Sequence, residues 1–280
     1  MPGVFAQTAC ADCGTAFVFP QPDAEELARY YPESYEAHLA STDGGIFKRI
    51  AARLGVRRKA KYVARFCGSG KLLDIGCGRG DFIQDAQRRG FEAFGVESSP
   101  QGVRLCRARG LNVEQCDFDA ADIGRASFDV VTMWHVLEHL RDPAGAVKKV
   151  AVALKPGGRF IFCVPNPASV NARVFGELWS GYDVPRHLFA FSEKAIARMV
   201  EASGLVMEDR RTFFGGFSAL NYDLKFWLDE KPGAGVPSRA VRFVARSIFF
   251  RVLTAPLMFL IEKLGRGPVI TYAARRPERL

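Results

Sequence analysis

The chain has 280 residues, of which 48% are hydrophobic and 25% are charged. This is the composition of an ordinary globular protein, and it excludes a chain that is disordered throughout. The formal net charge is +9, and residues 231–280 alone carry ten Lys/Arg against two Asp/Glu. Because the basic character is confined to this tail, we expect no nucleic-acid partner for the protein as a whole.

Seven cysteines are present, and two of them form the pattern Cys10-x-x-Cys13-Gly14. The odd number, and the lack of an apolar signal-peptide core after Met1, favour free thiols in a reducing cytoplasm. The Cys10/Cys13 pair is half of a zinc ribbon, but a closed zinc site needs four ligands. The next cysteine, Cys67, is too far along the chain, so we expect no zinc here. Two explanations stay open: the half-site is a remnant, or the protein begins upstream of Met1.

The predicted elements change in character along the chain. Residues 1–20 are irregular, a short helix is expected at 24–31, and 46–66 have the spacing of a basic amphipathic helix. From residue 71 onward, short apolar segments alternate with helical ones, which is typical of βαβ units and a parallel sheet. The expected strands are 71–76, 92–97, 112–116, 128–134, 159–164, 204–214 and 268–275, and the expected helices are 81–90, 100–110, 142–154 and 192–203.

This order predicts an α/β fold with a doubly wound, mostly parallel sheet, N-terminal helices and a helical insertion before the last strand. Four parts are expected. They are an N-terminal segment with the half zinc ribbon over 1–45, a nucleoside-binding domain over 46–214, a basic hydrophobic insertion over 215–267, and a last strand with its tail over 268–280.

The segment LDIGCGRGD, residues 73–81, joins the first strand of the alternating region to its helix. Its glycines Gly76, Gly78 and Gly80 let the backbone turn sharply and let a ligand approach without a Cβ in the way. The spacing G-x-G-x-G differs from the dinucleotide fingerprint G-x-G-x-x-G, which gives a pyrophosphate access to the helix N-terminus. With Asp74 two residues before the first glycine, the loop suits a ligand without phosphates.

The next strands end in groups that can bind a nucleoside. Glu97 ends the second strand, 23 residues after Asp74, where a carboxylate can accept hydrogen bonds from two ribose hydroxyls. Asp117 and Phe118 follow the third strand, where a carboxylate can accept from an adenine amino group and a ring can cover the base. Trp134 ends the fourth strand at the same edge.

Taken together, these residues resemble a class I S-adenosylmethionine-dependent methyltransferase, nearest to the bacterial ubiquinone-biosynthesis O-methyltransferases. The resemblance is close over 71–164 and looser over 46–214. It implies S-adenosylmethionine as the cofactor, with the glycines along its methionine part, Asp74 near its ammonium and Glu97 on its ribose. The residues expected to bind the cofactor are Asp74, Gly76, Cys77, Gly78, Gly80, Glu97, Asp117, Phe118 and Trp134.

His135, Glu138 and His139 lie just past the fourth strand, at a spacing that can place all three on one helical face. Side chains of these types can hold a divalent metal. The resembled methyltransferases are metal-assisted and carry Glu-x-x-Glu-His here, whereas this chain has His135 at the first position. The departure favours a role for Glu138 and His139 in bracing the helix start. We therefore expect no metal, and these three residues as the ligands if one binds.

His187 lies in the loop after the fifth strand, which borders the acceptor pocket in the resembled family. Its near-neutral reference pKa suits a general base for a hydroxyl acceptor, and a structural histidine that braces the loop is the alternative. His135 is the second catalytic candidate. The residues expected to line the acceptor pocket are Asn166, Trp179, Tyr182 and Arg186.

The segment 239–261 is hydrophobic, but its longest uncharged run, 252–261, has ten residues, about half of what a membrane span needs. Its apolar residues form one helical stripe opposite three arginines, and Pro256 is expected to break or kink the helix. Two interpretations are compatible: a lid that packs over the acceptor pocket, or a helix that lies on an anionic membrane surface. The stripe is Val241, Val244, Ile248, Val252 and Ala255, and the arginines are Arg239, Arg242 and Arg246.

The function that fits best is methyl transfer to a hydroxyl of a small quinone-, lipid- or sugar-like acceptor, in the cytoplasm or at the inner membrane face. One alternative is a nicotinamide-dependent oxidoreductase on a similar sheet. The glycine spacing and the pair Asp117–Phe118, expected at the adenine, argue against it. The other is a non-catalytic module that docks on membranes through its tail, against which the complete cofactor motif argues.

Overall fold

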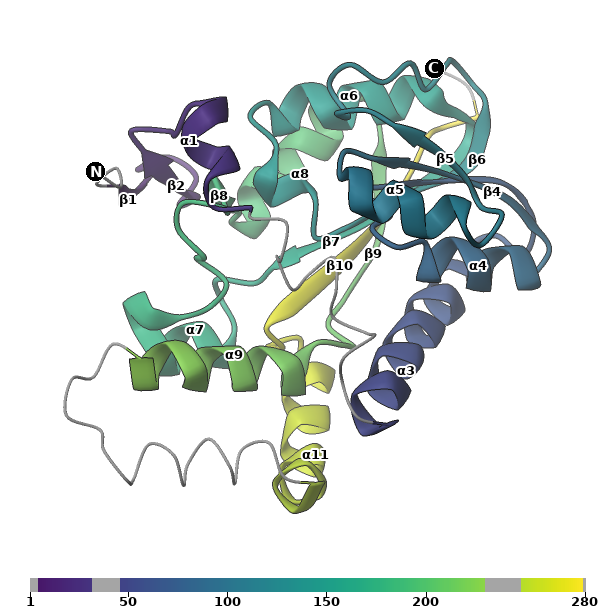
Figure 1. Cartoon of the computed structure of the whole chain (residues 1–280). Helices are drawn as coiled ribbons and strands as arrows, with labels where there is room; N and C mark the ends of the chain where they lie inside the picture. The colour runs from purple at the N-terminus through teal and green to yellow at the C-terminus, as the bar shows by residue number, and fades with distance from the viewer. Residues whose placement is uncertain (1–4, 32–45, 230–247, 279–280) are drawn as a thin grey trace.

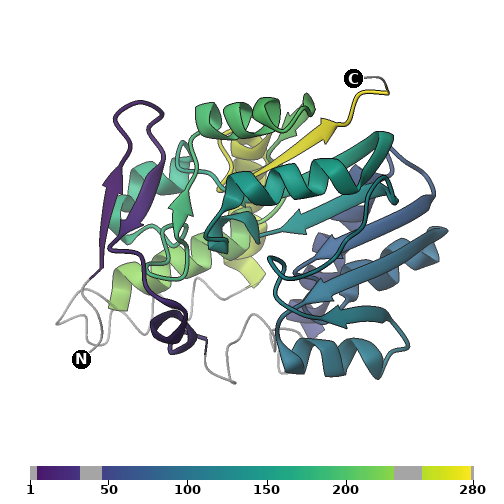
Figure 2. The ribbon, with the colours of Figure 1, turned by 90° about the horizontal axis from the view of Figure 1, so that it is seen from above.

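The computed structural model describes residues 5–31, 46–229 and 248–278. Its centre is a seven-stranded sheet in the order β5-β4-β3-β6-β7-β10-β9 (Figure 1, Figure 2). Strands β3 to β7 pair in parallel, and β10 runs antiparallel to both of its neighbours. The expected doubly wound, mostly parallel α/β sheet is confirmed. The strands are β3 (Gly70–Ile75), β4 (Phe91–Glu97), β5 (Asn112–Gln115), β6 (Phe128–Trp134), β7 (Leu154–Pro165), β9 (Val206–Arg211) and β10 (Val269–Arg275).

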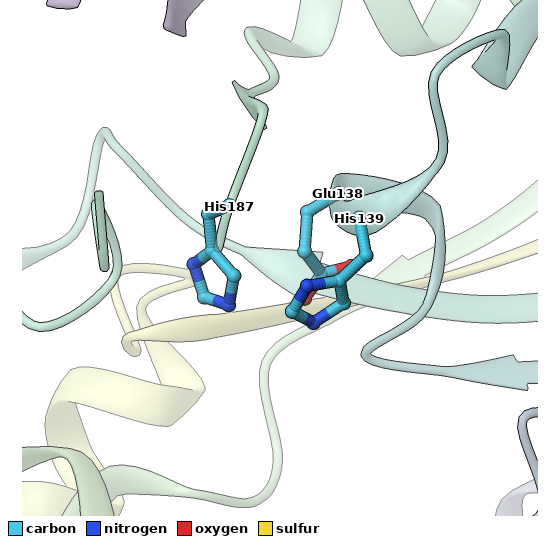
Figure 3. Close-up of side chains that lie close together, drawn as sticks. All are labelled: Glu138, His139 and His187. Carbon is cyan, nitrogen blue, oxygen red and sulfur yellow. The ribbon is translucent and has the colours of Figure 1, made fainter. Parts of the chain in front are cut away.

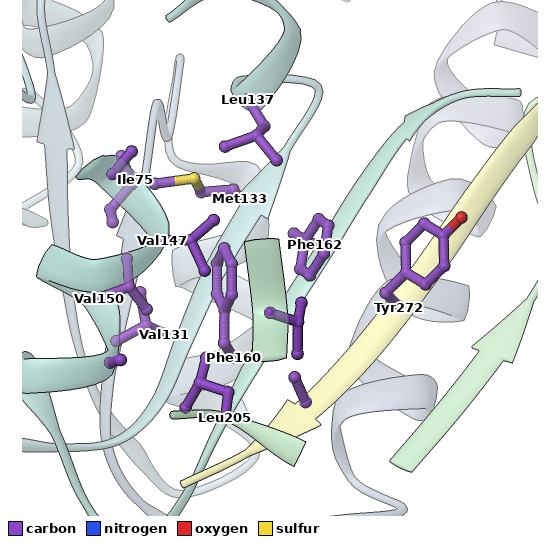
Figure 4. Close-up of a cluster of buried hydrophobic side chains, with 14 of the residues drawn as sticks. Ile75, Val131, Met133, Leu137, Val147, Val150, Phe160, Phe162, Leu205 and Tyr272 are labelled. Atoms are coloured by element: carbon purple, nitrogen blue, oxygen red, sulfur yellow. The ribbon is translucent and has the colours of Figure 1, made fainter. Parts of the chain in front are cut away.

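Helices cover both faces of this sheet, and the buried side chains alternate between the two. Leu72 and Val130 lie in a cluster with residues of α3, α4 and α5, while Leu73 and Val131 lie in a second cluster with residues of α6 and α8. Figure 4 shows the second cluster, around Phe160. A strand that is buried on both faces reads as a continuous apolar run, as 128–134 does. The helices are α3 (Ile46–Val63), α4 (Asp81–Arg88), α5 (Pro100–Arg107), α6 (Pro143–Ala153) and α8 (Glu193–Ala202).

Three of these helices begin at the polar residue that the sequence marks. The side chain of Ser99 accepts a hydrogen bond from the N–H of Gly102 before α5, and Asp142 accepts from Gly145 before α6. Ser192 accepts from Ala195 before α8. Such caps satisfy backbone N–H groups that have no partner inside the helix, and they fix where each helix starts.

The N-terminal segment is not irregular, so that expectation was wrong. β1 (Ala6–Ala9) and β2 (Ala16–Phe19) form a hairpin, and β8 (Phe189–Ala190) adds to it as a third strand. The helix α1 (Ala24–Ala28) follows. The two strands are too short to show a period, and the partner that stabilises them lies far along the chain. Cys10 and Cys13 flank the turn of the hairpin, and in the described part of the chain they belong to no cluster of three metal-binding side chains.

Two basic helices differ from the sequence expectation. In α3, Ile50 and Leu54 are exposed, and the buried residues are confined to the C-terminal end of the helix. The helix α11 (Ile248–Lys263) continues through Pro256 rather than ending there. Proline removes one helical N–H, so the carbonyl of Val252 loses its partner. Because Val252 is 66% exposed, water can hydrogen-bond that carbonyl. The preceding part of the predicted helix, including Val241, lies outside the described residues.

The described helices of the insertion pack against one another and against the segment after β7. The helix α9 (Gly216–Asp229) lies beside α7 (Val170–Phe175) and α11 (Figure 1). Its buried Asp223 accepts hydrogen bonds from the Asn171 side chain at 2.5 Å and from the backbone N–H of Ser180 at 2.8 Å. This carboxylate therefore fastens α9 to the loop that follows α7. In the described part of the chain, no helix is both long enough and apolar enough to cross a membrane.

Replacing Ser192 with Ala tests how the hairpin is attached. The Ser192 hydroxyl caps α8 and also donates to the backbone carbonyl of Cys13 at 2.5 Å. We expect S192A to lower the free energy of unfolding by about 1 kcal/mol and to raise amide exchange across the hairpin. The control is S99A, which removes the α5 cap alone and should leave exchange in the hairpin unchanged. Equal hairpin exchange in both variants would contradict the attachment.

Candidate functional site

The glycine loop leaves the carboxyl end of β3 in a conformation that glycine adopts most readily. Gly76, Gly78 and Gly80 have φ angles of +65°, +55° and +74°. A Cβ on Gly76 would lie 2.5 Å from the Val136 side chain, and one on Gly80 would lie 2.4 Å from the Leu111 side chain. A Cβ on Gly78 would meet nothing within 4 Å. The backbone of Gly78 therefore borders open space, where a ligand can approach.

Glu97 lies at the end of the neighbouring strand and faces this loop. Its Oε2 accepts a hydrogen bond from the N–H of Gly78 at 2.7 Å, and its Oε1 accepts from the N–H of Ser99 at 2.8 Å. The residue is 5% exposed. A carboxylate can accept about four hydrogen bonds, so both oxygens keep lone pairs for a ribose. Cys77, in contrast, packs its Sγ towards Gly95 of β4, so only its backbone faces the open side.

Asp74 is buried below the loop. Its Oδ1 accepts a hydrogen bond from the Thr132 hydroxyl of β6 at 2.6 Å. Burial raises the pKa of Asp74 to about 7, although the Thr132 hydrogen bond and the cation of Lys59 oppose the rise. A ligand with a positively charged group would stabilise the ionised form of this carboxyl. This agrees with the predicted position beside the cofactor's ammonium, which stays a prediction.

The two residues expected to contact the adenine lie in different surroundings, Asp117 at the surface and Phe118 in the core. Asp117 is exposed, and its backbone carbonyl accepts from the N–H of Ala120 and of Ala121. Phe118 is buried in the core cluster, and the ammonium of Lys149 lies 4.6 Å from the centre of its ring. One face of Phe118 is therefore already covered by a cation. Asp117 is the member of the pair that is free to contact a base from solvent.

Lys59 also lies at this edge of the sheet, a position that the sequence did not reveal because the residue is one of seven basic positions along α3. Its ammonium lies 4.8 Å from the ring centre of Trp134 and 5.3 Å from that of Phe214. Desolvation lowers the pKa of Lys59, while the charge of Asp74 opposes this. In the described part of the chain, no hydrogen-bond or ion-pair partner is recorded for its Nζ. A desolvated cation at this edge of the sheet is suited to bind a ligand carboxylate.

Three of the four residues expected at the acceptor pocket lie in the loop before β8, and the fourth, Asn166, lies elsewhere. Trp179 and Tyr182 pack edge to face, with ring centres 5.0 Å apart, and Trp179 is buried. Arg186 makes two hydrogen bonds to the Asp183 carboxylate. Asn166 does not match its expected role, because it is 1% exposed and both ends of its amide bond to backbone groups. It joins the end of β7 to the segment before β10.

Glu138, His139 and His187 come together near the end of β6 (Figure 3). One ligand atom from each lies within 4.8 Å of the others. Glu138 and His139 belong to the short 3₁₀ turn Leu137–His139, and His187 lies just before β8. The chain segments are tied by a backbone hydrogen bond from Leu188 N–H to the Glu138 carbonyl at 2.8 Å. The sequence predicted the first two residues as neighbours, but not their approach to His187.

His135 does not share a helical face with Glu138 and His139, so that expectation was wrong. Its φ of +60° is left-handed backbone, and the turn begins only after it. Its Nδ1 lies 3.0 Å from Glu138 Oε1. Burial opposes the cation, but Cys163 and Glu138 outweigh it and raise the pKa of His135 to about 10. The raised pKa favours a protonated imidazole that supports the Glu138 carboxylate over a general base, and a catalytic role of His135 stays a prediction.

Protonation differs across the group. Burial would raise the pKa of Glu138, but the hydrogen bond from His135 and the nearby imidazoles lower it to about 2. Burial and the approach of His187 lower the pKa of His139 to about 4. At neutral pH the group therefore combines a carboxylate with a neutral imidazole, held in place by the protonated His135.

The fold and the loop after β3 define a doubly wound α/β protein with a glycine-rich loop after its first parallel strand. A family profile described as a methyltransferase domain matches residues 46–209, more than half of the chain. The chain therefore belongs to this methyltransferase family, as its motifs indicated.

Curated relatives agree with this membership. The chain is 33% identical to the ubiquinone biosynthesis O-methyltransferase of Idiomarina loihiensis over 149 residues, and 36% identical to that of Alkalilimnicola ehrlichii over 127 residues. These alignments cover 48% and 41% of this chain, and 61% and 51% of the relatives. The chain thus spans little more than half of the length of the relatives it matches.

Solved structures share the fold. An S-adenosylmethionine-dependent methyltransferase from Mesorhizobium loti aligns with a TM-score of 0.53 at 20% identity, over 79% of this chain and all of that one. A 1,6-didemethyltoxoflavin-N1-methyltransferase from Burkholderia thailandensis, with S-adenosylhomocysteine bound, aligns with 0.55 at 16% identity, over 97% of this chain and all of that one. With the family match, these neighbours identify S-adenosylmethionine as the cofactor.

Replacing Lys59 with Gln tests whether its ammonium binds the carboxylate of the cofactor. We expect K59Q to weaken S-adenosylmethionine binding about 10- to 100-fold, the value of one charge-assisted hydrogen bond. Binding of 5′-methylthioadenosine, which lacks the amino-acid part, should not change, and calorimetry measures both. The control is K61Q, at an exposed position two residues along α3. An equal loss for both ligands in K59Q would show that Lys59 does not contact the carboxylate.

Proposed function

We propose that this methyltransferase transfers the methyl group of S-adenosylmethionine to a hydroxyl oxygen of a small quinone-, lipid- or sugar-like acceptor. The observation that supports this most is the group of Glu138, His139 and His187 beside the carboxyl ends of β3 and β6. Two imidazoles and a carboxylate can take up or share the proton that a hydroxyl must lose. Curated relatives are named ubiquinone biosynthesis O-methyltransferases, and this supports a quinone-like acceptor.

His187 is suited to act as the base. Its Nδ1 lies 2.8 Å from the carbonyl oxygen of Gly181. A carbonyl only accepts hydrogen bonds, so Nδ1 carries the proton and Nε2 keeps a lone pair. In the proposed reaction, Nε2 takes the hydroxyl proton as the oxygen attacks the methyl carbon. The carbon–sulfur bond breaks, its electron pair stays on sulfur, and S-adenosylhomocysteine leaves.

The cofactor-binding residues proposed from the sequence fit this reaction. Gly78 and Glu97 border the open side of the loop, and Asp74 lies below it, where the charge of Lys59 acts on its carboxyl. Trp179 and Tyr182 line the loop that carries His187, and Asp223 of α9 holds that loop at Ser180. We therefore propose that α9 serves as part of a cover over the acceptor. Membership in the methyltransferase family argues against the nicotinamide-dependent alternative.

The variant His187→Asn tests the base. Asparagine can keep the hydrogen bond to the Gly181 carbonyl, but it has no nitrogen at the position of Nε2. We expect kcat with a hydroxyl acceptor to fall about 10²- to 10⁴-fold, while the affinity for S-adenosylhomocysteine stays the same. Acceptor screening with phenols, sugars and lipid alcohols identifies the substrate first. Full turnover by H187N would exclude His187 as the base.

A contact with anionic membranes is a second proposal, for a lipophilic acceptor. Four leucines on α11 and directly after it are each more than half exposed, namely Leu253, Leu257, Leu260 and Leu264. Their spacing of four, three and four residues puts them on one helical stripe. Lys and Arg outnumber Asp and Glu ten to two over 231–280. An apolar stripe with basic surroundings suits the surface of an anionic bilayer.

Vesicle co-sedimentation tests this contact. We expect the protein to bind vesicles that contain phosphatidylserine, and we expect binding to fall as salt rises, because screening weakens the basic contribution. The double variant L257E/L260E should lose binding. A control, V174E, changes an exposed apolar residue of α7 and should bind as the wild type does. No binding at low salt would contradict the contact.

A further inference from the structure

We infer that Glu138, His139 and His187 form a binding site for a divalent transition-metal ion, with two imidazole nitrogens and one carboxylate oxygen as protein ligands. The metal site depends on the proposed function only for its role in catalysis, because the same three side chains are proposed to face the acceptor. The ligand atoms already lie within 4.8 Å of one another. Figure 3 shows the two imidazoles and the carboxylate converging on a common region.

Both imidazoles are held in the form that binds metals. The Nδ1 atom of His187 lies 2.8 Å from the Gly181 carbonyl, and that of His139 lies 3.0 Å from the Arg186 carbonyl. Each Nδ1 must therefore carry its proton, which leaves each Nε2 with a free lone pair. Metal-binding histidines nearly always donate their other N–H to a carbonyl or carboxylate in this way. Tyr31 adds a hydroxyl 2.9 Å from the same Nδ1 of His139.

The carboxylate is also prepared for a cation. Glu138 is fully buried, and its Oε1 is bonded to His135 at 3.0 Å. Its Oε2 is buried without a hydrogen-bond partner in the described part of the chain. An unpaired oxygen of a buried carboxylate costs free energy unless a cation or a donor reaches it. A metal ion between the two imidazoles would supply that partner.

The ligand set differs from that of the resembled methyltransferases, which carry Glu-x-x-Glu-His. Here the first position is His135, and its side chain supports Glu138 rather than joining the group. His187 takes the third place from a loop 49 residues away in the sequence. Two nitrogens and one oxygen favour zinc, cobalt or iron(II) over magnesium, which prefers oxygen ligands. A bound ion of this kind would lower the pKa of an acceptor hydroxyl. Because the ion would occupy the Nε2 lone pair of His187, it would take over the activation of the hydroxyl that His187 performs as a base in the metal-free protein.

The test measures metal binding and does not depend on turnover. Cys10 and Cys13 are first replaced by Ser to remove competing thiols, and Co²⁺, Zn²⁺ and Mg²⁺ are titrated into the otherwise full chain. We expect one Co²⁺ per chain, with visible absorption bands, and Zn²⁺ binding about 100-fold or more tighter than Mg²⁺. H187N and E138Q should each weaken Co²⁺ binding about 100-fold, and the exposed-site control E114Q should not.

Several results would overturn the inference. They are no Co²⁺ binding in the Cys-to-Ser protein, equal Co²⁺ affinity in H187N, or Mg²⁺ binding as tight as Zn²⁺. Calorimetry with S-adenosylhomocysteine shows that each variant is folded. If the protein binds no metal but H187N still loses methyl transfer, the inference fails and the proposed function stands. If the metal binds as expected but no hydroxyl acceptor is methylated, the proposed function fails instead.

Discussion

The hydrogen bond from the Gly78 N–H to the Glu97 carboxylate ties the loop after β3 to the end of β4, and the cofactor side of the site depends on it. Parallel pairing of β3 with β4 puts these two chain ends next to each other. The loop contains three left-handed glycines, and the N–H groups of Gly76 and Cys77 also donate to the Val96 carbonyl of β4. The buried Glu97 carboxylate accepts from the N–H groups of Gly78 and Ser99, which holds the loop and leaves lone pairs for a ligand.

The acceptor side depends on a different set of backbone contacts. Leu188 donates to the Glu138 carbonyl, and its own carbonyl accepts from the N–H of Val18 in β2. The N-terminal hairpin thereby holds the segment that carries His187 against the turn after β6. Residues from three distant parts of the chain are needed to place one imidazole. This gives the hairpin a direct part in arranging the group of Glu138, His139 and His187.

The sheet and its loop were predictable because their signals are local. Apolar runs such as 128–134, the cap at Ser192 and the glycine spacing each act within a few residues. The pairing of β2 with β8 joins segments more than 100 residues apart, and His187 approaches His139 from 48 residues along the chain. One sequence carries no local pattern for either contact. Lys59 was missed because its special property, desolvation beside Trp134, exists only after folding. Asn166 was misassigned because its polar type is equally suited to bonding the backbone.

The shared fold does not determine the reaction by itself, because function depends on the site. A [4+2]-cyclase aligns with this chain over 79% of its length with a TM-score of 0.51 at 20% identity. The assignment of methyl transfer to this chain therefore depends on cofactor binding at the glycine loop and at Glu97. Calorimetric titration with S-adenosylhomocysteine, of the wild type and of Glu97→Ala, tests this most directly. We predict micromolar binding that weakens about 100-fold in the variant, with the fold intact. Equal affinity in a folded E97A protein would contradict the account.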